Sequence, residues 1–490
     1  MTVGDKIDQA FEPVVWLLEQ VFFWDPFAAF GLDLGTQVPI IVLWLVFGGI
    51  FFTIRLRFVN IRMFSHAWQL LTGRYDNQED KGQVSHFQAL STALSATVGM
   101  GNIASVAIAV TVGGPGATFW MIVAGLLGMS LKFAECTLGV KYRHISPDGE
   151  VSGGPMYYLK QGLAKRGWRR AGMFLAGFYA LMAVGASVGG SNMLQANQAF
   201  AQFSLVFQGA QGHGFWFGVV LAILIGVVVI GGIKSIARVS SLVVPFMAIL
   251  YIGAAVIIIM VNIRNLGSAF GMILEGAFNA PAIKGGMIGV LITGFRRGVF
   301  SNEAGAGSAA IAHSAARVQH PVSEGLVSLL EPFIDTVIIC TMTSLVLIFT
   351  GLYKNPDSLE GAQLTSAAFA TVFSWFPYLL LVVILLFSFS TMVSWSYYGR
   401  KCFDYLFGNG FEKLTGNRIW ASHTYHLLFL FCTVIGASSS LVTVLDFSDM
   451  MLLSLTFPNL IGLIIMSGEI RADLKEYRIL KRNGVIRPLK

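Results

Sequence analysis

The hydrophobic residues of this chain fall into long runs that are separated by short polar connections. At roughly 20 apolar residues for each crossing of a bilayer, these runs predict eleven transmembrane helices. No connection is long enough to hold a soluble domain, so we expect an all-α integral membrane protein. The predicted spans are 37–56, 87–111, 116–140, 171–200, 215–232, 239–261, 284–315, 325–350, 376–402, 421–437 and 449–467.

Two of these spans contain a break in mid-membrane. The second span is interrupted at Gly99–Asn102, and the seventh at Gly298–Gly305. Hydrocarbon tolerates irregular backbone only where protein or a water-filled cavity surrounds it. Unwound N–H and C=O groups can hold a small ion or a zwitterion, and interrupted helices in corresponding halves of a chain indicate a transporter's binding site.

Without the first span, ten helices remain, five in each half, and each half begins with a discontinuous helix. An odd number of helices inverts the second half, so we predict a 5+5 inverted repeat. The expected segments are 1–36, extracytoplasmic with an amphipathic surface helix over 7–23; 37–85, an extra first transmembrane helix and a cytoplasmic loop; 86–262 and 263–468, the two repeats; and 469–490, a basic cytoplasmic tail.

Composition and charge agree with a membrane protein. Only 12% of the 490 residues are charged, against about 25% in soluble domains. Most of the 33 Lys and Arg residues lie in alternate connections, which places the N-terminus outside and the C-terminus inside a bacterial-type cytoplasmic (inner) membrane. The basic residues form no single patch, which argues against nucleic-acid binding. The four Cys show no metal-binding spacing, and we find no HExxH or Walker motif, so we expect neither an enzyme nor a cofactor.

Several uncommon strings occur in a recognisable order between about residues 40 and 465. The chain resembles the alanine or glycine:cation symporter family of the amino acid–polyamine–cation superfamily. The resemblance implies a leucine-transporter-like fold and Na⁺-coupled symport of alanine, glycine or another small neutral amino acid by alternating access, with a monomer sufficient. An H⁺-coupled transporter and a non-transporting receptor remain alternatives. The strings are 97–102, 113–121, 132–135, 153–158, 297–305, 312–315, 331–335 and 390–399.

The first break is the strongest candidate for a substrate site. Glycine permits backbone close to a ligand, and a helix N-terminus attracts a carboxylate. The alternative is a small-residue notch for a neighbouring helix. Likewise, the amide in the fourth span is either a ligand or an interhelical tie, and the Trp in the ninth span is either a pocket wall or an interfacial aromatic. The predicted substrate-binding residues are Thr97, Gly99, Gly101, Asn102, Gln195, Gly298, Phe300, Ser301, Asn302 and Trp395.

A cation site is predicted on the ninth span. Phe387, Ser390 and Thr391 are spaced i, i+3 and i+4, on one helix face. In the arrangement that the family resemblance implies, they oppose the carbonyls of Ser95 and Val98, and these neutral oxygens suit Na⁺. The alternative is that the two hydroxyls bond to carbonyls of their own helix.

The first intramembrane carboxylate to explain is Glu303, in the second break. An ionisable residue inside the membrane is a functional hypothesis by default. Glu303 has a coupling role in one interpretation. In the other it is a structural partner of Arg296 or Arg297, or a cap on the next half-helix.

Two further pairs of ionisable residues have helical spacing. Lys132 and Glu135, at i and i+3, predict a buried ion pair, with gating as the alternative for Glu135. Glu331 and Asp335, at i and i+4, predict a bonded structural pair; a proton relay or a second ion site that uses Asp335 is the alternative.

Overall fold

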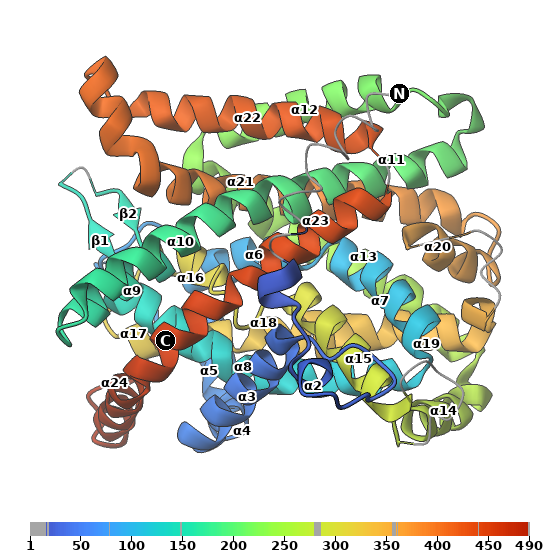
Figure 1. The fold of residues 1–490 in the computed structure, drawn as a ribbon, viewed down its shortest axis with the longest axis horizontal. Helices are drawn as coiled ribbons and strands as arrows, with labels where there is room; N and C mark the ends of the chain where they lie inside the picture. The colour runs from blue at the N-terminus through green and yellow to red at the C-terminus, as the bar shows by residue number, and fades with distance from the viewer. Residues whose placement is uncertain are drawn as a thin grey trace.

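The protein is a bundle of helices with one short hairpin (Figure 1). The computed structural model describes residues 16, 19–77, 79–147, 149–278, 286–354, 359, 361–439 and 441–488. Most of the surface helix predicted over 7–23 lies outside these residues, and nothing is concluded about it.

The elements of the first half run from a short turn of helix to a 30-residue helix. They are α2 (Pro26–Ala29), α3 (Ile40–Arg55), α4 (Val59–Arg62), α5 (Phe64–Leu71), α6 (His86–Thr97), α7 (Met100–Gly113), α8 (Gly116–Lys141), β1 (His144–Ile145), β2 (Val151–Ser152), α9 (Pro155–Ala164), α10 (Arg169–Val188), the π-helical η1 (Gly189–Met193), α11 (Leu194–Val206), the 3₁₀ turn η2 (Gln208–Ala210), α12 (Gly214–Val229) and α13 (Gly232–Val261). The two strands are antiparallel, with His144 opposite Ser152.

The second half is also helical. It contains the 3₁₀ turn η3 (Ile263–Asn265), α14 (Leu266–Phe278), α15 (Gly286–Asn302), α16 (Ala309–His313), α17 (Pro321–Ser328), α18 (Leu330–Pro332), the π-helical η4 (Phe333–Cys340), α19 (Thr341–Thr350), the 3₁₀ turn η5 (Leu352–Lys354), α20 (Ala362–Ala370), α21 (Phe376–Thr415), α22 (Ile419–Ser438), α23 (Leu441–Ser454) and α24 (Thr456–Arg482).

Helices occupy each of the eleven predicted spans, but their lengths differ. Among the described residues, seven helices are long and apolar enough to cross a membrane, and α6 with α7 makes an eighth if the pair is one bent span. Two predicted spans correspond to the shorter apolar helices α3 and α12. The limits of the two predicted repeats stay a prediction.

The first break is shorter than predicted. Helix α6 ends at Thr97, α7 begins at Met100, and the two helices are bent by 41°. Only residues 98 and 99 are unwound, so the prediction of unwound backbone through Asn102 is wrong: Gly101 and Asn102 lie in the first turn of α7. The reason is that the α7 helix resumes as soon as a polar side chain satisfies the free N–H of Gly99.

The second break lies further along the chain than predicted. Helix α15 continues through Gly298 and ends at Asn302. The irregular segment follows, and there Glu303, Gly305 and Gly307 all have positive φ, at 53°, 93° and 76°. A right-handed helix cannot contain such residues, so the backbone at 303–307 enforces the break.

The buried charges have other partners than their spacing predicted. Lys132 Nζ lies 2.9 Å from Glu331 Oε1, and both side chains are fully buried. The predicted Lys132–Glu135 and Glu331–Asp335 pairs are therefore wrong. A helix presents residues three or four apart on the same face, but here that face packs against another helix, α8 against α18, whose groups approach more closely.

The two arginines of α15 also have a distant partner. The guanidinium groups of Arg296 and Arg297 lie 2.8 Å and 2.9 Å from the carboxylate of Asp449 on α23. The expected pairing of either arginine with Glu303 is wrong, because Glu303 follows the end of α15 and turns away into the break.

The extra first helix, α3, is wedged between two others. A Cβ atom added to Gly48 would lie 3.0 Å from the side chain of Leu460 on α24, and one added to Gly49 would lie 2.9 Å from Leu127 on α8. Small residues allow transmembrane helices to approach in this way. Helix α3 therefore joins α8, which supports the second break, to α24.

The ion pair between Lys132 and Glu331 generates a stability prediction. Removing one partner of a buried pair leaves a charge uncompensated and costs about 3–5 kcal/mol. We expect Lys132→Met and Glu331→Gln each to lower the thermal unfolding temperature of the detergent-solubilised protein strongly. The double variant should be less destabilised than the sum of the two; strict additivity would show that the pair does not interact.

Candidate functional site

The helix that follows the first break and the helix that precedes the second meet inside the bundle. A Cβ atom added to Gly101, in the first turn of α7, would lie 3.0 Å from the Cα atom of Ser301, near the end of α15. Close contact of the two backbones therefore requires glycine at position 101. The contact brings together the two segments that the sequence predicted to face each other.

The side chain of Asn102 bonds to the first break, to α15 and to η4. Its Oδ1 accepts the N–H of Gly99 at 2.9 Å, and its Nδ2 donates to Ser301 Oγ at 3.2 Å and to Asp335 Oδ1 at 2.7 Å. The other carboxylate oxygen of Asp335 accepts from the hydroxyls of Ser301 and Thr336 at 2.7 Å and 2.8 Å. We call Asn102, Ser301 and Asp335 the junction.

The carboxylate of Asp335 is buried with neutral donors only. All three junction side chains have no exposed surface, and every hydrogen-bond partner of the carboxylate among the described residues is an amide or a hydroxyl. An ionised carboxylate away from water requires a compensating positive charge. The junction is therefore suited to bind a cation, an ammonium group or a proton.

The described structure has a π-helical segment near each of two site residues. The first, η1, ends two residues before Gln195, whose Oε1 accepts the N–H of Met100 at 3.4 Å. The second, η4, contains Asp335. Such π-turns occur preferentially at functional sites. Gln195 thus forms an interhelical bond at the start of α7, and its role as a substrate ligand stays a prediction.

Around the predicted cation site, one hydroxyl lacks a partner. Ser95 Oγ donates to the carbonyl of Ser390 at 2.8 Å, and Ser390 Oγ donates to the carbonyl of Phe387 at 3.0 Å. Thr391 Oγ1, by contrast, is buried and has no hydrogen-bond partner among the described residues. A Cβ atom at Gly99 would lie 2.6 Å from it, so the hydroxyl is aimed at the unwound backbone.

These groups fit a small hard cation. The helix α6 ends here, so its last carbonyl oxygens, up to that of Val98, lack the N–H donors that a continuing helix would supply. The unpartnered Thr391 hydroxyl stands opposite them, and hydroxyl and carbonyl oxygens are the ligands that alkali and alkaline-earth cations prefer. The bonds of Ser390 within its own helix agree with the structural alternative for that residue, although its oxygen keeps lone pairs that can bind a cation.

Other predicted substrate residues lie on a different face. A Cβ atom at Gly298 would lie 3.1 Å from Cβ of Ala124, so this glycine packs closely against α8, and its contact with a substrate stays a prediction. Asn302 donates to Thr336 at 2.9 Å. Phe300 is buried, with its ring 5.9 Å from the guanidinium of Arg297. Helix α15 thus turns only Ser301 directly toward the junction.

Two acids and a tryptophan form hydrogen bonds around the second break. Trp395 Nε1 donates to Glu303 Oε1 at 3.0 Å, and Ser308 Oγ donates to the other oxygen of that carboxylate. Glu135 Oε1 accepts the N–H of Gly305 at 2.8 Å. Only the bond of Glu135 satisfies backbone of the break. The carboxylate of Glu303 binds two side chains instead, which agrees with a structural role but not with a cap on the N–H groups of α16. Thr97 bonds within its own helix, to the carbonyl of Ala93 at 3.3 Å.

Sequence reasoning missed several buried partners. Asn459 donates to Glu135 at 2.9 Å. The carboxylate of Glu324 lies between His86, the first residue of α6, and His313, the last residue of α16, and is 2.5 Å from His313 Nδ1. An acid inside an apolar run was the available signal. Its partner could not be inferred, because it lies far away in the sequence.

Comparison with known proteins gives one family. The model of the sodium:alanine symporter family matches residues 31–489. The sodium/alanine symporter AgcS of Methanococcus maripaludis is 41% identical over 451 residues, covering 91% of this chain and 95% of that relative. GlnT of Bacillus subtilis, described as a probable sodium/glutamine symporter, is 34% identical and covers 92% of this chain and 90% of its own length.

The fold also agrees with a solved structure. The crystal structure of MhsT in complex with L-phenylalanine superposes with a TM-score of 0.50 at 16% identity, covering 79% of this chain and 98% of that chain. The predicted leucine-transporter-like, all-α membrane fold is thereby confirmed. With the family match over almost its whole length, the chain belongs to the sodium:alanine symporter family, a family of transporters rather than enzymes.

Proposed function

We propose that this protein carries a small neutral amino acid, alanine or glycine, into the cell together with Na⁺ by alternating access. Its family supports Na⁺-coupled amino-acid symport in general. The observation that carries the proposal is the buried, unpartnered hydroxyl of Thr391 beside the Gly99 break. Close packing of Thr391 and Ser301 against the first break favours a substrate with a short side chain.

In the proposed site the cation and the amino acid share one break. The carbonyls of Ser95, Val98 and Phe387, with the hydroxyls of Ser390 and Thr391, would bind Na⁺. The first turn of α7 would bind the carboxylate of the amino acid, because a helix N-terminus offers free N–H groups and the positive end of its dipole. Gly101 permits the close approach, and Gln195 lies within reach of the same turn.

The junction would receive positive charge. Asp335 is buried without a charged partner among the described residues, so either the ammonium group of the amino acid or a second cation would compensate its carboxylate. We therefore assign Asp335 to coupling. Glu135 and Glu303 are assigned to holding the second break instead, since backbone N–H, hydroxyl and indole groups already bind them.

Burial of the site supports alternating access. Asn102, Ser301 and Thr391 are at most 2% exposed, so a solute reaches them only when helices move apart. On the side where α6 begins, His86 and His313 both bind the carboxylate of Glu324. Opening of the helix bundle on that side would break this contact. We propose that a monomer is sufficient for transport.

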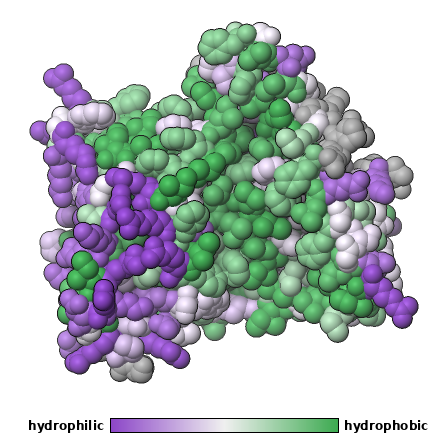
Figure 2. Space-filling view, turned by 90° about the horizontal axis from the view of Figure 1, so that it is seen from below, coloured by the Kyte–Doolittle hydropathy of each residue, from purple (hydrophilic) through white to green (hydrophobic). Residues whose placement is uncertain are grey.

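The distribution of polar side chains supports the proposed orientation. Figure 2 shows hydrophilic residues gathered at one end of the molecule, next to a broad hydrophobic band. The basic end of α24 and the loop that follows α3 belong to the Lys- and Arg-rich side. By the positive-inside rule, this end faces the cytoplasm, with the C-terminus inside and the N-terminus outside.

Transport in proteoliposomes tests the coupling ion. We expect uptake of labelled alanine with an inward Na⁺ gradient and a fall to background when choline replaces Na⁺. Counterflow of labelled alanine against unlabelled alanine should also occur. Full uptake in choline with a proton gradient would establish H⁺ coupling instead, whereas binding without counterflow would establish a receptor.

The Thr391 hydroxyl gives a sharper prediction. A group that contacts a charge contributes about 1.5–3 kcal/mol, which corresponds to at least about a tenfold change in affinity. Thr391→Val should therefore raise the Na⁺ concentration for half-maximal uptake by at least that factor. Thr415→Val, at the exposed end of the same helix, is the matched control. An unchanged Na⁺ dependence in Thr391→Val would remove this residue from the cation site.

Asp335 is tested by a neutral isostere. Asp335→Asn keeps an oxygen that can accept from Asn102 but removes the negative charge, so we expect uptake to fall to background while the protein remains in the membrane. Glu476→Gln, an exposed acid on α24, should transport normally. Substantial Na⁺-driven uptake by Asp335→Asn would show that the junction needs no negative charge.

A further inference from the structure

A basic hollow lies outside the transport site, between the end of α3 and the last turns of α24. Its volume is about 470 Å³. Apolar side chains, among them Leu56 and Leu474, form part of its wall. Six cationic residues line the rest, and we call them the basic hollow: Arg55, Arg57, Arg471, Lys475, Arg478 and Arg482.

These positive charges are not compensated by the described part of the protein. Within the described ranges, none of the six residues forms an ion pair, and two nearby acids are engaged elsewhere: the carboxylates of Glu469 and Asp473 lie 2.9 Å and 2.7 Å from Lys141 Nζ. Arg55 Nε is buried without a hydrogen-bond partner among the described residues. Six like charges around one hollow repel one another, so an anion bound between them would relieve this repulsion.

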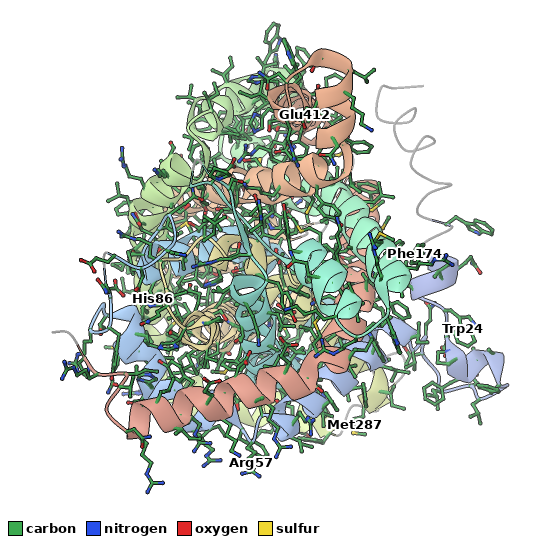
Figure 3. The ribbon with its side chains drawn as sticks, turned by 90° about the vertical axis from the view of Figure 1, so that its left-hand side faces the viewer. Trp24, Arg57, His86, Phe174, Met287 and Glu412 are labelled. Atoms are coloured by element: carbon green, nitrogen blue, oxygen red, sulfur yellow. The ribbon has the colours of Figure 1, made fainter. Side chains whose placement is uncertain are left out.

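The backbone directly after α3 has an unusual conformation, which places a cationic side chain at the basic hollow. Arg57 and Phe58 are consecutive non-glycine residues with φ of 55° and 56°, a left-handed conformation that is strained for such side chains. Strain of this kind persists where a function requires it. The turn brings Arg57 to the hollow, and Figure 3 shows this residue at the edge of the bundle beside the α24 helix.

An apolar surface leads from the bilayer to the hollow. On α3, Phe47, Ile50 and Ile54 have 51%, 45% and 62% of their surface exposed, and their spacing places them on one face of the helix. Phe58, in the turn, is also exposed. A ligand at this position therefore meets hydrocarbon-facing side chains on one side and cations on the other.

We propose that the basic hollow binds the headgroup of an anionic phospholipid whose acyl chains lie along the exposed face of α3. Basic pockets between transmembrane helices on the cytoplasmic side are suited to phosphate headgroups, and Arg side chains bind phosphate oxygens in a bidentate manner. A free anion would compensate the positive charges of the basic hollow but would not cover the exposed apolar face of α3. The lipid fastens α24 to α3, and through α3 to α8.

Lipid binding by the purified full-length protein in detergent tests this site. We expect phosphatidylglycerol to bind saturably and to raise the unfolding temperature, whereas phosphatidylcholine and inorganic phosphate at equal concentration have little effect. With about 1 kcal/mol for each cation near a lipid surface, Arg55→Gln/Arg478→Gln should weaken phosphatidylglycerol binding about 30-fold. Arg169→Gln/Arg170→Gln removes the same charge from exposed positions away from the hollow and should bind as the unaltered protein does.

Three results would overturn the proposal. They are unchanged phosphatidylglycerol binding by Arg55→Gln/Arg478→Gln, an equal loss in the Arg169 and Arg170 control, and inorganic phosphate binding as tightly as the lipid, which would identify a soluble-anion site. If the first variant does not fold, Arg57→Gln/Lys475→Gln, which alters two exposed side chains, provides the same measurement and the same expected loss.

Discussion

One buried amide connects the two interrupted helices, and the site is arranged around it. Hydrocarbon offers no water to a free backbone N–H, so an unwound helix must be satisfied by the protein. Asn102 does this for Gly99 with its oxygen and binds Ser301 and Asp335 with its nitrogen. Because one side chain satisfies the break and also reaches α15 and η4, a change in the shape of the first break disturbs its contacts with both of these helices.

The second break depends on side chains that come from other helices. Glu303 has the left-handed φ that ends α15, and Trp395 and Ser308 hold its carboxylate. Glu135 accepts the N–H of Gly305 from the opposite side. These bonds link the second break to α8 and α21. In the proposed mechanism, a ligand compensates the negative charge of Asp335.

Sequence patterns located the spans and both breaks because these depend on local properties: apolar length, glycine, and polar residues inside an apolar run. The same patterns did not predict which buried side chains pair with each other. Lys132 was assigned to Glu135 by helical spacing, yet Glu331 lies at 2.9 Å, and Asp449, about 150 positions along the chain, binds both arginines of α15. Spacing fixes which residues share a face of a helix, whereas tertiary packing decides what that face meets.

The shortness of the first break bears on how two ligands become coupled. Only residues 98 and 99 are unwound, so carbonyls that would bind the cation and N–H groups that would bind the carboxylate lie on adjacent peptide units. Thr391 faces this segment from one side and Asn102 binds it from within. In the proposed mechanism, ordering these two residues for one ligand orders them for the other. Since coupling free energy is reciprocal, Na⁺ must then raise the affinity for the amino acid by the same factor by which the amino acid raises the affinity for Na⁺.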